Sequence, residues 1–274
     1  MIRKATLILF LFIFCSVLGV KAQQVKATSS GLKFSISFDK SVHQSDITGR
    51  VYLMISKNNR REPKNQVGLT GVPFWGMNVE KLAPGDQAFI NDQVFGYPLE
   101  SISEIPAGEY YIQGFINVYT EFKRSDGHTL WMHKDNWEGQ NWRRGEGNLF
   151  SNVKKVYLDP SKSEIIKLIC NNSNPAVEIP DDSKMVKRVR IKSKLLSDFW
   201  GQPMYLGATV LLPDGYDENP DEFYPVNYQH GHFSLGVPFG FRDPDAPSAS
   251  SRRSNQEFTD FWMSDDCPPL IAIK

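Results

Sequence analysis

The sequence has few cysteines, and their scarcity excludes two classes of protein. Three cysteines occur among 274 residues, and Cys15 lies in an apolar N-terminal segment. The remaining two, Cys170 and Cys267, are too few for a disulfide-stapled small fold or for a zinc site built from thiolates. They fall in segments that we assign to different domains. We therefore expect two free, buried thiols rather than a mutual bridge.

The chain also lacks any excess of charge. Its 31 basic and 31 acidic residues cancel, and no long run of Lys or Arg forms a basic face. Nucleic-acid binding and docking to anionic membranes depend on such a face, so we expect neither. Aromatic residues make up 12% of the chain, which fits a dense β-core or contact with sugars without distinguishing between them.

The N-terminus has the features of a secretory signal peptide. Arg3 and Lys4 precede an apolar run from residue 5 to residue 20, and Val20-Lys21-Ala22 offers a cleavage site before Gln23. The run is shorter than the roughly 20 residues that span a bilayer, although a retained signal anchor is the alternative. We expect residues 1–22 to be removed, no membrane span in the mature chain, and export to the periplasm or the cell exterior.

The first part of the mature chain, residues 23–170, predicts an all-β, Ig-like sandwich of antiparallel strands. Residues 32–38 alternate apolar and polar side chains, and residues 51–55 and 110–119 are rich in strand formers. Residues 153–158 and 164–170 flank a turn and predict a hairpin. Turn signals recur between these segments without a helical period, as is typical of a sandwich.

The second part predicts an α/β arrangement. Residues 171–185 contain Pro175 and Pro180 among polar residues and predict a linker. Two strands are then expected around a turn at residues 198–203, and a third at residues 224–229. A short helix at 255–263, with Phe258, Phe261 and Trp262 on one side, precedes the apolar run 270–273, which is typical of a buried parallel strand. The predicted strands cover residues 186–191 and 205–212.

Two short segments resemble a known enzyme family. Residues 211–216 read Leu-Leu-Pro-Asp-Gly-Tyr, and residues 224–232 read Tyr-Pro-Val-Asn-Tyr-Gln-His-Gly-His. This pair is similar to the opening of the esterase-D-like, or enterochelin-esterase-like, branch of the α/β-hydrolases. The resemblance implies that residues 186–274 are the first part of an α/β-hydrolase domain, and that the family's Ser-His-Asp mechanism applies to the full protein.

The resemblance also assigns an oxyanion loop. In the family, the loop after the third strand donates one backbone N–H to the oxyanion, and this loop corresponds here to Gly231, His232 and Phe233. The sequence departs from the family at Asn227 and Gln229, which interrupt a strand that is usually apolar. Either the strand is less buried than in the family, or these polar side chains hold the loop.

The catalytic triad itself is not found in the sequence. Ser234 follows His232 by two residues, where the tight nucleophile elbow requires a small side chain. No G-x-S-x-G occurs, so we expect the nucleophile, acid and base after Lys274. His230 and His232 lack further ligands at a recognisable spacing, and we expect no metal and no cofactor. A turn histidine that bonds backbone remains the alternative for both.

Three tryptophans raise a second functional hypothesis. Trp131, Trp137 and Trp142 lie in a stretch rich in Gly, Asn and charge. Rings in such polar loops often stack on ligands, including sugars, but they also plug the end of a sandwich or dock on a second domain.

The sequence thus predicts an exported carboxylic-ester hydrolase, represented here by its N-terminal domain and the opening of its catalytic domain. The full-length protein would act on a small ester or an acylated glycan, and residues 23–274 alone would be inactive. The alternative is a non-catalytic binding or accessory protein whose β-sandwich recognises glycan or polypeptide.

Overall fold

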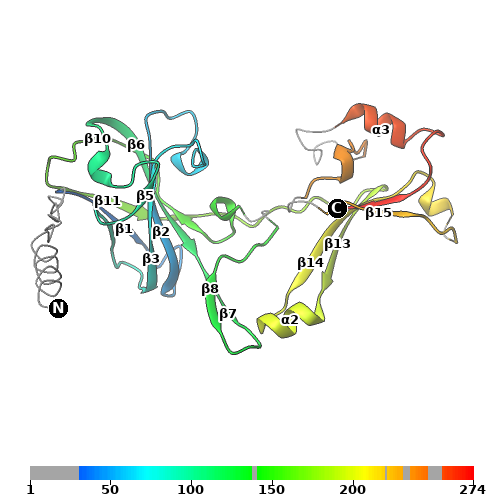
Figure 1. Cartoon of the computed structure of the whole chain (residues 1–274), viewed down its shortest axis with the longest axis horizontal. Helices are drawn as coiled ribbons and strands as arrows, with labels where there is room; N and C mark the ends of the chain where they lie inside the picture. The colour runs from blue at the N-terminus through cyan, green and yellow to red at the C-terminus, as the bar shows by residue number, and fades with distance from the viewer. Residues whose placement is uncertain (1–30, 138–140, 220, 231–234, 246–254) are drawn as a thin grey trace, which may run out of the picture.

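A computed structural model describes residues 31–274 except 138–140, 220, 231–234 and 246–254 (Figure 1). The described residues form sixteen strands and two α-helices, so the protein is β-rich. The predicted signal peptide, residues 1–22, lies outside the described residues. No helix among the described residues is long and apolar enough to cross a bilayer.

The N-terminal part, residues 31–174, contains two packed sheets and a separate two-stranded hairpin. In the smaller sheet β1 lies between β11 and β4. The larger sheet has the order β12-β9-β6-β2-β3-β5, and β10 also pairs with β6. The smaller sheet comprises β1 (Leu32–Phe38), β4 (Ala88–Ile90) and β11 (Glu164–Cys170). The larger comprises β2 (Ile47–Ser56), β3 (Phe74–Leu82), β5 (Gly96–Tyr97), β6 (Gly108–Val118), β9 (Leu149–Phe150), β10 (Lys154–Leu158) and β12 (Asn172–Ser173).

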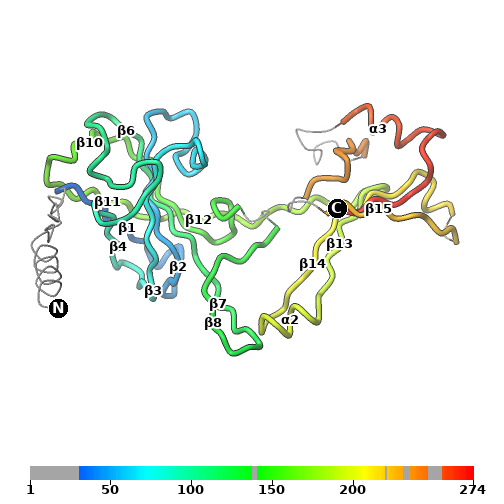
Figure 2. Tube along the Cα trace, viewed as in Figure 1, coloured from blue at the N-terminus to red at the C-terminus, as the bar shows by residue number. Residues whose placement is uncertain are grey.

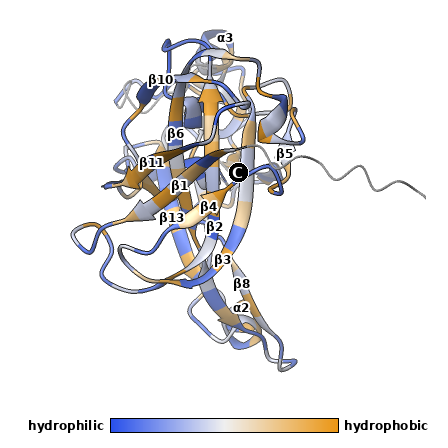
Figure 3. Cartoon of the chain, turned by 90° about the vertical axis from the view of Figure 1, so that its left-hand side faces the viewer, coloured by the Kyte–Doolittle hydropathy of each residue, from blue (hydrophilic) through white to orange (hydrophobic). Residues whose placement is uncertain are grey.

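One hydrophobic core joins the two sheets. Phe34 and Ile36 of β1 are fully buried, and they belong to the same cluster as Leu53 of β2 and Ile112 of β6. The hydropathy colours show apolar and polar residues alternating along the strands (Figure 3). The strands at residues 32–38, 51–55 and 110–119 are therefore confirmed. The described connections contain only the 3-10 turns η1 (Pro63–Asn65), η2 (Ile102–Glu104) and η3 (Trp142–Arg144) as helical elements.

Two expectations about pairing were wrong. The predicted hairpin at residues 153–170 consists of two strands that enter different sheets: β10 pairs with β6 and β11 with β1. The turn between them is therefore a corner from one sheet to the other. In addition, β1 and β11 run parallel, so the pairing is not wholly antiparallel. A local turn signal does not specify which partner a strand finds, because that depends on distant strands.

The predicted linker begins later than expected. Asn172 and Ser173 pair with Phe150 and Leu149, and Asn174 is buried. The segment at 171–174 therefore belongs to the larger sheet, and the irregular stretch starts at Pro175. Both cysteines are free thiols, as expected, but only Cys170 is buried, and Cys267 is half-buried.

The C-terminal part has a four-stranded sheet of order β13-β14-β16-β15. β13 (Val186–Lys192) and β14 (Tyr205–Leu211) pair antiparallel along their whole length. β16 (Ile271–Ile273) is antiparallel to β14 and parallel to β15 (Val226–Tyr228). Helix α3 (Gln256–Trp262) precedes β16, and 3-10 turns lie at η4 (Tyr216–Glu218) and η5 (Pro238–Gly240). The expected strands and the expected helix are all present.

One helix was not predicted from the sequence, and the Phe261 side chain was predicted on the wrong side of another. Helix α2 (Lys194–Trp200) forms between β13 and β14, where only a turn was predicted. Ser193 caps its first turn through the Leu196 amide, and Gly201 ends it with a left-handed φ of 66°. Both are recognised helix boundary signals. In α3, Phe261 is exposed rather than sharing the buried side with Trp262.

A hairpin connects the two parts in space. β7 (Thr120–Lys123) and β8 (Thr129–Met132) pair only with each other and extend from the N-terminal part towards α2 (Figures 1 and 2). Phe122 is 2% exposed and meets Trp200 edge-to-face, with ring centroids 5.5 Å apart. The Ser125 amide donates to the Phe199 carbonyl at 2.8 Å. The two parts are thus held together by aromatic packing and by backbone hydrogen bonding.

Candidate active site

The carboxyl ends of β15 and β16 meet at one edge of the C-terminal sheet, here called the carboxyl edge. Tyr228 and Ile273 are paired residues in the parallel register. The next amide, that of Gln229, donates to the Ile273 carbonyl at 2.7 Å. Ligands of open α/β sheets bind outside the carboxyl ends of the strands, so this edge is the place where a catalytic site would be sought.

The predicted oxyanion loop begins at this edge. His230 is exposed and directly follows Gln229. Gly231, His232 and Phe233, together with Ser234, lie outside the described residues, so their geometry is not part of the site described here. Among the described residues, no group of three or more side chains capable of binding a metal lies together.

Gln229 links the two ends of the segment that contains the loop. Its side-chain oxygen accepts a hydrogen bond from the Phe239 amide at 3.3 Å. The Phe239 ring in turn packs against Phe258 of α3 at 4.9 Å between centroids. The residue that departs from the family pattern therefore holds the chain on either side of residues 231–234. Asn227 is exposed, as is the whole of β15, which forms the sheet edge. The strand is therefore less buried than the family pattern implies, and the loop itself lies outside the described residues.

Helix α3 is fixed over the sheet by its last residue. The Trp262 indole N–H donates to the Leu212 carbonyl at 3.0 Å, and the side chain is 5% exposed. Asn255 caps the first turn by accepting from the Phe258 amide at 3.1 Å. Leu212 directly follows β14 and opens the Pro-Asp-Gly turn of the first family motif. The motif, the helix and the sheet are therefore one packed unit with a core of its own.

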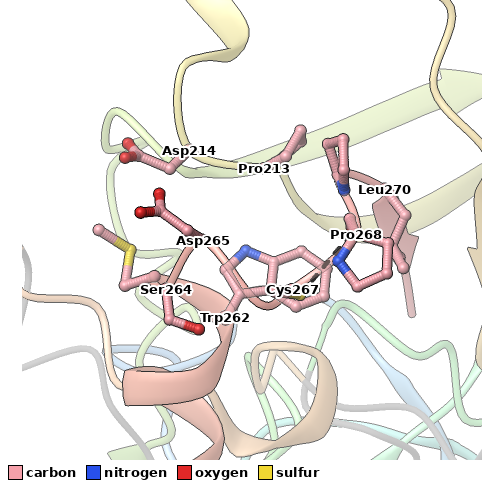
Figure 4. Close-up of a pocket in the computed structure, with 10 residues that line it drawn as sticks. Pro213, Asp214, Trp262, Ser264, Asp265, Cys267, Pro268 and Leu270 are labelled. Atoms are coloured by element: carbon pink, nitrogen blue, oxygen red, sulfur yellow. Dashed lines mark hydrogen bonds between the residues drawn. The ribbon is translucent and has the colours of Figure 1, made fainter.

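The described cavity of this part lies at the opposite edge. It has a volume of about 260 Å³, and its walls come from the turn after β14 and from the segment between α3 and β16. Figure 4 shows Asp214 and Asp265 on one side of it and Leu270 on the other. Because Leu270 precedes β16, the cavity opens at the amino end of that strand. It is therefore separate from the carboxyl edge.

The tip of the β13–β14 hairpin projects on the same side as the carboxyl edge. β14 is antiparallel to β16, and Val210 pairs with Ile273. Residues 205–208 of β14 therefore continue beyond the end of β16 in the carboxyl direction, towards α2. The β7–β8 hairpin contacts α2, so the N-terminal part meets the C-terminal part on the side where the predicted oxyanion loop begins.

Two of the three candidate tryptophans are packed against protein. The Trp142 ring stacks on Tyr52 with centroids 4.6 Å apart and meets Phe115 edge-to-face at 5.4 Å. The Trp137 ring lies on Gly207 of β14, where an added Cβ would be 2.4 Å from its nearest ring atom. Trp131 in β8 is 45% exposed. The structure does not bring the three rings together as one ligand platform.

Burial changes the acidity of one side chain in this aromatic cluster. The Tyr52 hydroxyl group is removed from water, which raises its pKa to about 12, against a smaller opposing effect of Arg50. The Arg50 guanidinium lies 5.5 Å from the Tyr52 ring. At neutral pH Tyr52 is a neutral hydroxyl beneath the Trp142 ring, and this cluster provides packing rather than acid–base chemistry.

Comparison of the chain with protein-family models and with curated proteins finds no match.

Proposed function

We propose that this chain provides an Ig-like sandwich domain and the opening segment of an α/β-hydrolase domain in an exported carboxylic-ester hydrolase. The observation that carries the proposal is the position of His230. It follows β15 at the carboxyl edge of a parallel β15–α3–β16 unit, whose strand β16 pairs with β14 of the antiparallel β13–β14 hairpin. This is the position that the family resemblance requires for the start of the oxyanion loop.

In the proposed enzyme, an amide of residues 231–233 would donate a hydrogen bond to the oxyanion of the tetrahedral intermediate. A donor that is already aimed at developing negative charge lowers the barrier by about 3 kcal/mol. Gln229 would support this role by fixing the chain on both sides of the loop through Phe239. The nucleophile, acid and base would come from sequence after Lys274, and ester hydrolysis would follow the Ser-His-Asp route.

The N-terminal part would limit access to this site. Its β7–β8 hairpin contacts the C-terminal part on the carboxyl-edge side, with Trp137 on β14 and Trp131 exposed on β8. An ester substrate would approach through the space that these residues border. The substrate proposed is a small ester or an acylated glycan.

The alternative, a binding protein that uses the sandwich alone, receives less support from the structure. Trp142 and Trp137 are already engaged with Tyr52 and Gly207, which leaves Trp131 as the exposed ring of the three. A single exposed ring is common on protein surfaces and does not by itself make a binding platform.

The reading frame downstream of codon 274 distinguishes these two functions. The hydrolase predicts in-frame sequence with G-x-S-x-G, followed by an acidic residue and a histidine, and turnover of short acyl esters by the encoded protein. An accessory protein predicts a reading frame without that motif and no turnover above background. The second outcome would refute the proposed function.

A further inference from the structure

The N-terminal part contains a lysine in an unusual position. Lys64, in the 3-10 turn η1, is 7% exposed, although lysine is almost never fully buried unless it is paired. Its Nζ lies 3.2 Å from the centroid of the Phe150 ring and 3.2 Å from the side-chain oxygen of Asn174. The Glu62 carboxylate is 3.5 Å away on the solvent side, with its side chain 42% exposed.

The side-chain amide of Asn174 is held in one orientation by its other contacts. Its Nδ2 donates to the Arg143 carbonyl at 2.8 Å and to the Gly145 carbonyl at 3.1 Å. Its backbone N–H donates to the Asn148 carbonyl at 2.8 Å. Both Nδ2 protons are thus engaged, and the carbonyl end of the amide faces Lys64. Asn174 is 7% exposed, so water has little access to this contact.

Burial makes the neutral amine of Lys64 more accessible than that of an exposed lysine, although the Phe150 ring face, the Asn174 oxygen and Glu62 each favour the ammonium form. Removal from water lowers the pKa of Lys64, and the attraction of Glu62 opposes this shift only in part. A buried amine is a better nucleophile than a solvated ammonium, since it carries a free electron pair more of the time. An amine, a carboxamide and a carboxylate therefore lie together in a largely buried site whose apolar side is the Phe150 ring.

We propose that Lys64 and Asn174 form an intramolecular isopeptide bond, with Glu62 as the base that transfers the proton. The Lys64 Nζ attacks Cγ of Asn174, and a C–N bond forms. Glu62 takes one proton from Nζ and gives it to Nδ2, and the Cγ–Nδ2 bond then breaks. The products are a secondary amide and one ammonia. No oxidant or reductant is consumed.

The contacts of Asn174, Phe150 and Lys64 fit this reaction, and Glu62, which contacts Lys64 Nζ, would turn towards Nδ2 to deliver the proton. The carbonyls of Arg143 and Gly145, which accept from Nδ2 in the amide, can also accept from the nitrogen as it becomes protonated and leaves. The Phe150 ring shields one side of the reacting atoms from water. The backbone of Lys64 is fixed as well, because its N–H donates to the buried Gln113 side chain at 3.0 Å. The reactants are therefore held in place before the reaction.

The bond would covalently link the turn after β2 to the C-terminal end of the N-terminal part. Lys64 follows β2, and Asn174 is the last residue before the irregular segment that leads to the C-terminal part. The cross-link would enclose β3 to β12 in a covalent loop and would anchor the point from which the second part extends. An exported protein benefits from such a link, since it needs no redox partner to form and is not reversed by reductants.

Mass spectrometry of the purified mature protein tests the proposal. The reaction removes one ammonia, but cyclisation of an N-terminal Gln23 would remove the same mass. The decisive observation is therefore a proteolytic product in which the peptides containing Lys64 and Asn174 are joined. Fragmentation should place the junction between these two side chains.

Three variants serve as matched controls. Glu62→Gln alters an exposed carboxylate, should leave the fold intact and should abolish or slow the cross-link. Lys64→Arg keeps the charge but should give only separate peptides. Asn174→Asp, if it reacts, should lose water in place of ammonia. Separate, unmodified Lys64 and Asn174 peptides in the folded wild-type protein would overturn the proposal, as would a cross-link that forms equally fast in Glu62→Gln.

Discussion

The contact between Phe122 and Trp200 predicts that a substitution in the N-terminal part will destabilise the C-terminal part. Phe122 is 2% exposed, and full burial of a phenylalanine contributes about 1.5–3 kcal/mol. An aromatic pair contributes a further ~0.5–1.5 kcal/mol. Phe122→Ala should therefore cost about 2–4.5 kcal/mol in all, and the ~0.5–1.5 kcal/mol of the ring pair with Trp200 should be lost from the β13–β14 region.

Amide hydrogen exchange followed by mass spectrometry measures this effect directly. Peptides from β13 and β14 should exchange faster in Phe122→Ala and in Trp200→Ala than in the wild type. The double variant should be less destabilised than the sum of the two, by the ~0.5–1.5 kcal/mol of the pair. Leu195→Ala is a suitable control, because Leu195 lies on the same helix as Trp200 but is 82% exposed.

Additive effects in this double-mutant cycle would show that Phe122 and Trp200 do not stabilise each other. The expected stabilisation would also be refuted if Phe122→Ala changed exchange only in the N-terminal part. Either result would mean that the hairpin does not hold the C-terminal part, and the proposed restriction of access to the carboxyl edge would lose its basis.

Three further outcomes are expected. Trp142→Ala removes two aromatic pairs and should lower the free energy of unfolding of the N-terminal part by about 1–3 kcal/mol in urea titrations; an unchanged midpoint would argue for a free ligand platform. Burial raises the pKa of Tyr52 from 10.0 to about 12. The stability that its neutral form contributes is therefore present below pH 10 and is lost as the pH rises towards 12. Over that range the wild type should lose free energy of unfolding more steeply than Tyr52→Phe. Residues 23–274 alone should show no esterase turnover, and activity that disappears in Ser234→Ala would contradict the absence of a nucleophile.

Local patterns were enough to predict most individual elements. The alternation at residues 32–38 specified β1, and the apolar run 270–273 specified β16 with its parallel neighbour. Helix α2 was missed although Ser193 and Gly201 mark its ends, because the segment between them is only seven residues long and lacks a clear amphipathic period.

Long-range contacts could not be predicted in the same way. The strands at residues 154–158 and 164–170 were recognised, but they entered different sheets, since pairing depends on strands far away in the chain. The cluster of Lys64 with Asn174 joins residues 110 positions apart. No spacing or motif connects them, and a buried lysine looks like any surface lysine until its neighbours are known.

We propose that an amide of residues 231–233 is the oxyanion donor at the carboxyl edge. The test is a proline scan of Gly231, His232 and Phe233 in a chain that includes the proposed nucleophile, acid and base, with kcat for a short acyl ester as the measurement. Proline removes one N–H at a time, and loss of the oxyanion donor should lower kcat by about 10²–10³-fold at one position. Unchanged kcat in all three variants, with the fold retained, would contradict the assignment of this loop.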